Sequence, residues 1–335
     1  MHVWQISSFG IDSLELTERP DPEPGPGQVV VRVHAISFNY RDLMMVKGLY
    51  NPKLRLPRVP CSDGAGEVVA VGAGVTMWRR GDRVAGIFMQ NWLDGPPAPE
   101  KVKGALGGDV DGMLAEYVVL HENGMVAVPD HMSFQEASTL PCAAVTAWNA
   151  LAAGDVKPGG TVLVQGTGGV SIFALQFARL RGAKVLGISG SHDKLHRAYE
   201  LGLDAGLNYN EVPEWDRWAI EQTGEGVDLI VEVGGVGTLP RSLRALRMGG
   251  TIAQVGVLTG VTTGEALPMA AILHKQARIR GIYVGSRQDF IEMNRAITLT
   301  QLRPVGEDFP WTQARQVLAR MEEASHFGKL VMTIG

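Results

Sequence analysis

Thr161-Val-Leu-Val-Gln165 leads into Gly166-Thr-Gly-Gly-Val-Ser171, and a helical pattern then runs on to Ala183-Lys-Val-Leu-Gly-Ile-Ser189. A β-branched apolar run is typical of a buried strand, and the apolar spacing after the glycines is that of a helix. This order predicts a dinucleotide-binding βαβ unit, because the glycines let the backbone approach a pyrophosphate at a helix N-terminus. The fingerprint is incomplete, since Ser171 replaces its third glycine, so the interpretation depends on the rest of the chain.

The residues on both sides of this stretch continue the alternation of helices and strands. Ser133 with Glu136 forms a possible capping box at the start of a helical segment. Further strands are predicted at 206–209, 228–233 and 251–257. Strands separated by helix-length intervals predict a doubly wound parallel sheet, with ligands at the carboxyl ends of its strands. A strand at 279–284, helices at 288–301 and 311–324, and a strand at 330–334 could complete either domain.

The first 125 residues have a different pattern. Alternating apolar residues predict strands at 28–35, 64–72, 84–88 and 116–120, and prolines and glycines separate them. This composition favours a barrel-like or irregular β domain. The stretch 90–112 lacks any periodicity and is predicted to be a long loop.

The composition excludes several classes of protein. The chain has 335 residues, a net charge of -4 and 45% hydrophobic residues, which describes a globular protein without general attraction to nucleic acid or to an anionic membrane. Its two cysteines, Cys61 and Cys142, are too few for a disulfide framework. The sequence lacks both a signal-peptide pattern and an apolar run of membrane-spanning length. We therefore expect a cytoplasmic protein whose partner is a small molecule.

Several short patterns together resemble the medium-chain dehydrogenase/reductase superfamily over essentially the whole chain. They are Asn39-Tyr-Arg-Asp42, Asp63-Gly-Ala-Gly-Glu-Val68, Gly81-Asp-Arg-Val84, Gly166-Thr-Gly-Gly-Val170 and Gly328-Lys-Leu-Val331. The resemblance implies an α/β chain with a GroES-like β-rich catalytic domain at 1–125, completed by about 265–335. A Rossmann cofactor-binding domain would occupy 126–264. The resemblance also implies a homodimer or homotetramer, for which edge strands of the Rossmann sheets would pair.

Within that superfamily the chain is similar to the zinc-independent branch, which holds quinone oxidoreductases and alcohol-dehydrogenase-like reductases. Aligning the motifs places Asn39 where zinc enzymes carry a cysteine ligand and Ser62 where they carry a histidine, so only Cys142 remains. One thiolate with an amide and a hydroxyl is a poor zinc site. The four cysteines of the structural zinc lobe are also missing. We therefore expect no metal, and we expect Cys142 to be a small buried residue rather than a nucleophile.

The end of the second strand favours NADP(H) over NAD(H). NAD-binding domains carry an acid there for the ribose 2′-OH, whereas this strand ends at Ser189. Ser189, Ser191 and Lys194 could bind a 2′-phosphate by hydroxyl and charge. Asp193 argues against this only if it turns toward the ribose, and its alternative place is the first turn of the next helix. The alternative interpretation of Lys194 is a solvated surface lysine that does not contact the cofactor.

The resemblance implies further contacts with the cofactor. These residues are Thr146, Gly166, Gly168, Gly169, Val170, Tyr209, Gly234, Gly256, Val257, Ile282 and Val284. For the aliphatic members, ordinary core packing is the alternative interpretation.

The expected chemistry is reduction of a conjugated acceptor. Without a metal, hydride delivery needs a positioned cofactor, donors for the developing oxyanion and a proton source, and a quinone or α,β-unsaturated carbonyl spreads that charge best. The segment 39–50 borders the nicotinamide in the family. It offers Asn39 as an amide donor, Tyr50 as a donor or stacking ring, and Arg41, for which pairing with Asp42 is the alternative. The alternatives are a zinc-free alcohol dehydrogenase or carbonyl reductase, and a catalytically silent cofactor-binding protein.

Overall fold

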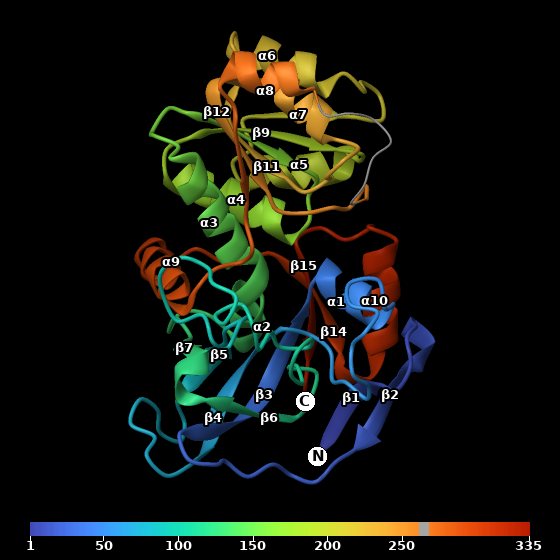
Figure 1. The fold of residues 1–335 in the computed structure, drawn as a ribbon, viewed down its shortest axis with the longest axis vertical. Coiled ribbons are helices and arrows are strands. Elements are labelled where there is room, and N and C mark those ends of the chain that lie inside the picture. Colours follow the sequence, from blue (N-terminus) through green and yellow to red (C-terminus); the bar gives the residue numbers. More distant parts are fainter. Residues whose placement is uncertain (261–267) are drawn as a thin grey trace. The chain divides into compact units, whose positions relative to one another are not determined.

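The computed structural model describes residues 1–260 and 268–335, which divide into two compact units (Figure 1). The first unit is Met1–Val145 with Val284–Gly335, and the second is Thr146–Tyr283. The sequence placed the first boundary at 125/126. The structure places it later because helix α2 (Phe134–Ser138) packs on strands β3 and β4 of the first unit. The boundary expected at 264/265 lies outside the described residues, but the second unit runs on to Tyr283, so residues 268–283 belong to it and not to the catalytic domain as predicted.

The second unit is built on a six-stranded parallel sheet. Its strands are β8 (Thr161–Gln165), β9 (Lys184–Ser189), β10 (Ala205–Asn208), β11 (Val227–Glu232), β12 (Leu246–Gln254) and β13 (Arg278–Gly281). They lie in the order β10-β9-β8-β11-β12-β13, and every neighbouring pair is parallel. This confirms the doubly wound sheet. The strand predicted at 279–284 is β13, at the edge of this sheet.

Helices cover both faces of that sheet. They are α3 (Val145–Gly154), α4 (Gly169–Leu180), α5 (His192–Glu200), α6 (Trp215–Thr223), α7 (Leu239–Ala245) and α8 (Met269–Lys275). On one face Leu163, Ile230 and Ile252 of the central strands pack with Trp215 of α6 and Leu243 of α7. Helices α4 and α5 contact β8, β9 and β10. A parallel sheet needs this double cover, because both of its faces are apolar.

The first unit contains a seven-stranded sheet. Its strands are β3 (Gln28–Phe38), β4 (Asp63–Val71), β5 (Arg83–Gly86), β6 (Tyr117–His121), β7 (Met125–Ala127), β14 (Gly306–Pro310) and β15 (Lys329–Thr333). Strand β15 pairs with β3 in antiparallel register, with Leu330 opposite Phe38. The returning segment therefore completes the β-rich unit, a question that the sequence left open. Its helices are α1 (Tyr40–Val46), α2, α9 (Arg287–Thr300) and α10 (Ala314–Glu322).

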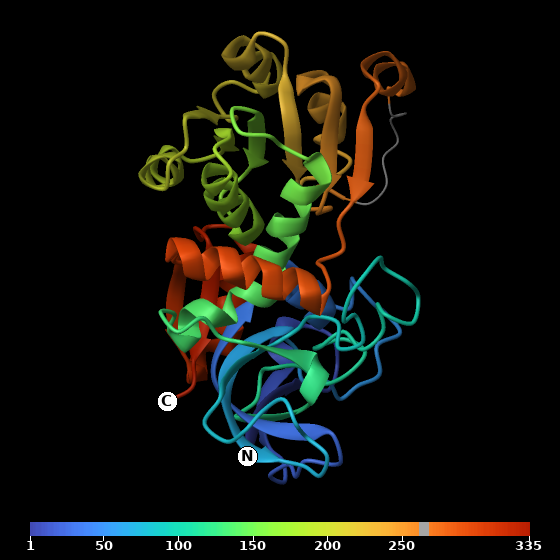
Figure 2. The same ribbon diagram turned by 90° about the vertical axis from the view of Figure 1, so that its left-hand side faces the viewer.

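The stretch 90–112 is a loop, as its lack of periodicity predicted. It forms no named helix or strand and makes only isolated bridges, Met89 with Ala105 and Leu106 with Val110 (Figure 2, teal). Trp92 and Leu106 are nevertheless buried, so this loop contributes to the packing of the first unit. None of the described helices is long and apolar enough to cross a membrane.

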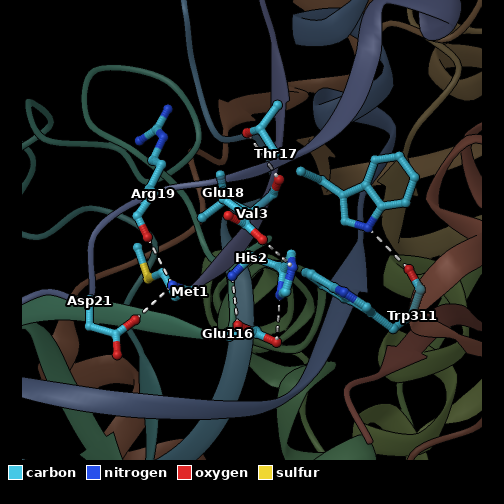
Figure 3. A network of polar contacts seen from close by, with 10 residues as sticks. Met1, His2, Val3, Thr17, Glu18, Arg19, Asp21, Glu116 and Trp311 are labelled. Carbon is cyan, nitrogen blue, oxygen red and sulfur yellow. Dashed lines mark hydrogen bonds and ion pairs between the residues drawn. The ribbon is translucent and has the colours of Figure 1, made fainter.

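A hairpin of β1 (His2–Ile6) and β2 (Leu14–Glu18) carries the start of the chain (Figure 3). The Met1 ammonium donates to the Arg19 carbonyl at 2.8 Å and to Asp21 at 2.7 Å. The Trp4 indole N–H donates to the Trp311 carbonyl at 3.0 Å. This bond joins the hairpin to the returning C-terminal segment within the first unit.

Candidate active site

The glycine turn after β8 leaves room for a ligand. Gly166 has a φ of 70°, and Gly168 caps the N-terminus of α4, which has no side-chain cap among the described residues. A Cβ built on either glycine would meet no described atom within 4 Å, chain neighbours aside. The free N–H groups of the first helical turn, which includes Gly169 and Val170, suit a pyrophosphate. These residues therefore fit a bound dinucleotide.

Ser171 explains the incomplete fingerprint. Its hydroxyl donates to the Gln165 carbonyl at 2.6 Å, and the residue is buried. The side chain thus turns back onto the end of β8 and fixes α4 against it. A small residue with a local hydrogen bond performs the packing that the third glycine usually allows.

The β9–α5 turn brings the predicted ribose-side residues together. Ser189 is buried at the end of β9, and its Oγ accepts from the Ser191 N–H at 3.3 Å. Ser191 caps α5 and accepts from the Lys194 N–H at 3.4 Å. Asp193 lies in the first turn of α5, the alternative place predicted for it. The strand end itself therefore carries the hydroxyls of Ser189 and Ser191, and the nearest carboxylate in the chain is that of Asp193 in the helix that follows.

The other predicted cofactor residues follow strands of the same sheet, with two exceptions. The strand-end residues are Tyr209 after β10, Gly234 after β11, Gly256 and Val257 after β12, and Ile282 after β13. Parallel topology gathers them at the carboxyl edge of the sheet. Thr146 lies in the first turn of α3 and is buried. Val284 belongs to the first unit and has a φ of 57°.

A buried carboxylate behind this edge escaped the sequence analysis. Glu232 is fully buried and accepts from the Gly234 and Gly235 N–H groups at 2.9 and 3.0 Å. It also accepts from Gln165 Nε2 at 2.8 Å and from the Ser242 hydroxyl. These bonds fix the turn that carries Gly234. An acid inside an apolar strand, directly before two glycines, is the signal that could have revealed it.

In the first unit, Asn39 and Ser62 lie side by side. Asn39 is the N-cap residue of α1. Its backbone N–H donates to Asp42 Oδ2 at 2.9 Å, as in a capping box. Its amide nitrogen donates to Ser62 Oγ at 3.4 Å, and the Ser62 hydroxyl donates to Asp63 Oδ1 at 2.7 Å. The Cys142 N–H donates to Asp63 Oδ2 at 3.0 Å. The three positions that the resemblance aligns with zinc ligands thus surround Asp63.

Buried charges determine the electrostatics of this cluster. Asp42 and Asp63 are fully buried, and Lys329 is 3% exposed. Burial raises the pKa of Asp42 to about 6 although Arg41 opposes it, and burial raises the pKa of Asp63 against the pull of Lys329. Burial, with Asp63 nearby, also raises the pKa of the Cys142 thiol. That thiol is therefore protonated at neutral pH and a poor nucleophile.

The donor set does not suit zinc. The Lys329 ammonium donates to Asn39 Oδ1, the oxygen that a metal would need. Ser62 uses its hydroxyl on Asp63, and Cys142 carries its proton. Among the described residues, no group of three His, Cys, Asp or Glu side chains is arranged to hold a metal ion. Zinc prefers thiolate, imidazole and carboxylate ligands.

Arg41 and Tyr50 form a second group near the loop 90–112. The Arg41 guanidinium carbon lies 4.8 Å from the Phe88 ring centroid and 5.7 Å from that of Tyr50. Its Nη1 donates to the Leu106 carbonyl at 2.6 Å and lies 3.5 Å from Asp42 Oδ1. The pairing with Asp42, considered as the alternative for Arg41, is therefore present. Tyr50 is 43% exposed.

Family models match both parts of the chain. Residues 25–130 match the alcohol dehydrogenase GroES-like domain, and residues 169–298 match the zinc-binding dehydrogenase model. A zinc-type alcohol dehydrogenase-like protein of Schizosaccharomyces pombe is 43% identical over 333 residues, which cover 97% of this chain and 96% of that protein. An acryloyl-coenzyme A reductase of Metallosphaera sedula is 30% identical over 87% of each chain.

Solved structures agree with these matches. A crystal structure from Sinorhizobium meliloti, described as that of an alcohol dehydrogenase, superposes with a TM-score of 0.92 at 39% identity. The match covers 99% of this chain and 98% of the other.

Proposed function

Because the chain belongs to the medium-chain dehydrogenase/reductase superfamily of nicotinamide-dependent oxidoreductases, we propose that it is a zinc-independent, NADPH-dependent reductase of quinones or α,β-unsaturated carbonyl compounds. The observation that carries the proposal is the hydrogen bond from Lys329 to Asn39, at a position where zinc relatives need a metal ligand.

The second unit would hold the cofactor. The turn from Gly166 to Gly169 would bind the pyrophosphate with backbone N–H groups, and the hydroxyls of Ser189 and Ser191 with the Lys194 amine would bind the 2′-phosphate. When bound, NADPH supplies a hydride. Ser189 in place of an acid supports NADPH over NADH, because a carboxylate there would repel the phosphate.

The first unit would bind the acceptor. The Asn39 amide is a buried neutral donor whose N–H meets Ser62 Oγ at 3.4 Å, a long hydrogen bond that a stronger one to an oxyanion would replace. A neutral amide is a weaker electrophile than a zinc ion. Conjugated acceptors suit it, because their negative charge spreads over an enolate or a hydroquinone. The M. sedula relative is named for the reduction of such an acceptor.

A second candidate is a zinc-free alcohol dehydrogenase or carbonyl reductase. The names of the S. pombe relative and of the S. meliloti structure favour it. A simple ketone concentrates the developing charge on one oxygen and needs a strong acid nearby. Tyr50 is the phenol that we favour for supplying the proton, ahead of Tyr40 in the same segment.

One experiment separates these functions. Purified protein is mixed with NADPH or NADH and with a quinone, an enone or a simple ketone, and absorbance of the reduced nicotinamide is followed. We expect oxidation of NADPH with the quinone or the enone. Oxidation with the ketone alone would favour the second candidate, and tight NADPH binding without turnover would favour a silent cofactor-binding protein. Stoichiometric zinc in elemental analysis would contradict the metal-free site.

A further inference from the structure

A lysine ammonium lies buried beside the candidate catalytic amide. Lys329 is the first residue of β15, and the pairing of Leu330 with Phe38 places it next to the end of β3. Its Nζ donates to the Phe38 carbonyl at 2.7 Å and to Asn39 Oδ1. An ammonium is strongly hydrated in water, so burying it costs free energy unless the protein replaces those bonds. In the sequence this lysine is visible only as part of the pattern Gly328-Lys-Leu-Val331, which assigns no role to its side chain.

The ammonium determines which way the Asn39 amide points. A lysine Nζ can only donate, so the atom that faces it must be the amide oxygen. The amide nitrogen therefore faces the opposite side, where it donates to Ser62 Oγ at 3.4 Å and also hydrogen-bonds Asp63. The Asn39 backbone is also fixed, because its N–H is bonded to Asp42. Both the position and the orientation of the amide are thus determined by neighbouring groups.

The same lysine also balances a buried acid. Asp63 accepts from Ser62 and from the Cys142 N–H, and the Lys329 charge counteracts the rise of the Asp63 pKa. A purely structural role for Lys329, neutralising Asp63, is therefore the alternative that an experiment must separate.

We propose that Lys329 is a positioning residue: its ammonium holds the Asn39 amide with its N–H groups on the side of Ser62 and Asp63, where the N–H that meets Ser62 Oγ at 3.4 Å can donate to the oxygen of the acceptor instead. The inference rests on the proposed function, in which Asn39 is that donor. A fixed monovalent cation behind a neutral donor would thereby do part of what a divalent ion does in zinc relatives, since it makes the amide a stronger donor.

A double-mutant cycle between Lys329 and Asn39 tests this proposal. Lys329→Met keeps the length of the side chain and removes the charge, and Asn39→Ala removes the amide. We expect Lys329→Met to lower kcat about tenfold while the KM for NADPH changes less than about twofold, because a transition-state interaction is lost. In the Asn39→Ala background the same substitution should leave kcat unchanged. An equal loss of kcat in both backgrounds would overturn the proposal.

The pair Lys329→Met with Asp63→Asn separates positioning from charge balance. Removing both charges should restore the melting temperature that Lys329→Met loses, because no uncompensated charge remains buried. The kcat should stay low, since the amide is still not held. Recovery of kcat together with stability would mean that Lys329 only neutralises Asp63. If Lys329→Met does not fold, the kcat of the Lys329→Met/Asp63→Asn protein is compared with that of Asp63→Asn alone.

The experiments distinguish a failure of the positioning role of Lys329 from a failure of the proposed reductase activity. If the wild-type protein oxidises NADPH with none of the acceptors, the proposed function fails. The coupling between Lys329 and Asn39 can then still be measured from the melting temperatures of the cycle. If the wild-type protein is active and Lys329→Met retains its full kcat, only the positioning role fails.

Discussion

The raised pKa of Asp42 makes the free energy of unfolding fall as the pH rises, which is opposite to the usual effect of a carboxyl group. Burial raises its pKa from 3.8 to about 6, so between these values the folded protein holds a proton that the unfolded chain releases. Its contribution to stability is therefore complete below its unfolded pKa and is lost as the pH rises through its folded pKa. Paired acids with lowered pKa, such as Asp228, act in the opposite direction.

Asp42→Asn should remove this dependence. Since one pKa unit corresponds to about 1.4 kcal/mol, the free energy of unfolding of the wild type relative to the variant should fall by about 2.4 kcal/mol between pH 4 and pH 7. The asparagine oxygen can still accept from the Asn39 N–H, so helix α1 keeps its cap. Urea unfolding at several pH values measures the difference. Parallel pH curves for the two proteins would contradict the raised pKa.

Lys194 tests the proposed cofactor preference. Because a hydrogen bond to a charged group contributes about 1.5–3 kcal/mol, Lys194→Ala should raise the KM for NADPH by about tenfold or more and leave that for NADH nearly unchanged. Lys157 is 73% exposed in the same unit and pairs with Asp155, so Lys157→Ala is the matched control for loss of one positive charge. Equal effects of Lys194→Ala on both cofactors would remove Lys194 from the phosphate site.

At the scale of the element, the glycine turn can be tested by adding single methyl groups. Gly168 has a φ of -77°, which alanine adopts without strain, and the space around its Cβ is open. We expect Gly168→Ala to change the free energy of unfolding by no more than about 1 kcal/mol. The Kd for NADPH, measured by its fluorescence, should rise about tenfold, because the methyl group would occupy the approach of the pyrophosphate.

Gly159 supplies the matched control for the turn. It has a φ of 82° and open space around its Cβ, but it precedes β8 rather than following it. Gly159→Ala should cost about 1 kcal/mol of stability through backbone strain and leave the Kd for NADPH unchanged. Unchanged NADPH binding in Gly168→Ala would mean that the cofactor does not approach this glycine.

Element patterns in the sequence predicted the fold well where they are local. Strand β8 has the predicted bounds, and the Ser133–Glu136 capping box is present. Strand β13 ends at Gly281 rather than at 284, and the left-handed backbone of Val284 cannot continue a strand. Strand β12 begins earlier than predicted, at Leu246, because Leu246 pairs with Val227 of β11 before a register shift leads to the pairing of Thr251 with Leu229.

The candidate site was predictable only in part. Sequence motifs identified the glycine turn and the Asn39 and Ser62 positions, because these depend on short local patterns. The role of Lys329 depends on β15 pairing with β3, which brings together residues about 290 positions apart. Glu232 likewise gains its partners from α7 and β8. Periodicity carries no information about such contacts.

At the scale of the whole molecule, we propose that two copies associate beside β13. This strand is the last in the order of the described strands of the parallel sheet, and its four residues are exposed among the described residues. Exposed apolar side chains lie on the preceding helix α8, where Leu273 is 74% exposed. An edge strand with apolar neighbours is a template for pairing with another chain.

Replacing Leu273 should weaken this association. We expect the wild type to sediment with at least twice the 36.0 kDa mass of one chain, and Leu273→Lys to shift the equilibrium toward single chains. Leu299 of α9 is 84% exposed in the first unit, so Leu299→Lys is the matched control and should not change the mass. A monomeric wild type at micromolar concentration would refute the proposed association.

The discontinuous first unit also affects how the protein forms during synthesis. Residues 146–283 leave the ribosome as one continuous block, and their sheet can assemble while translation continues. Strand β3 must wait for β15, and so for almost 300 further residues. During that interval the groups around Asp63 lack their lysine, and the edge of β3 with which β15 later pairs is open to chaperones and to other nascent chains. The charge that orders the candidate site is thus also among the last parts of the fold to be supplied.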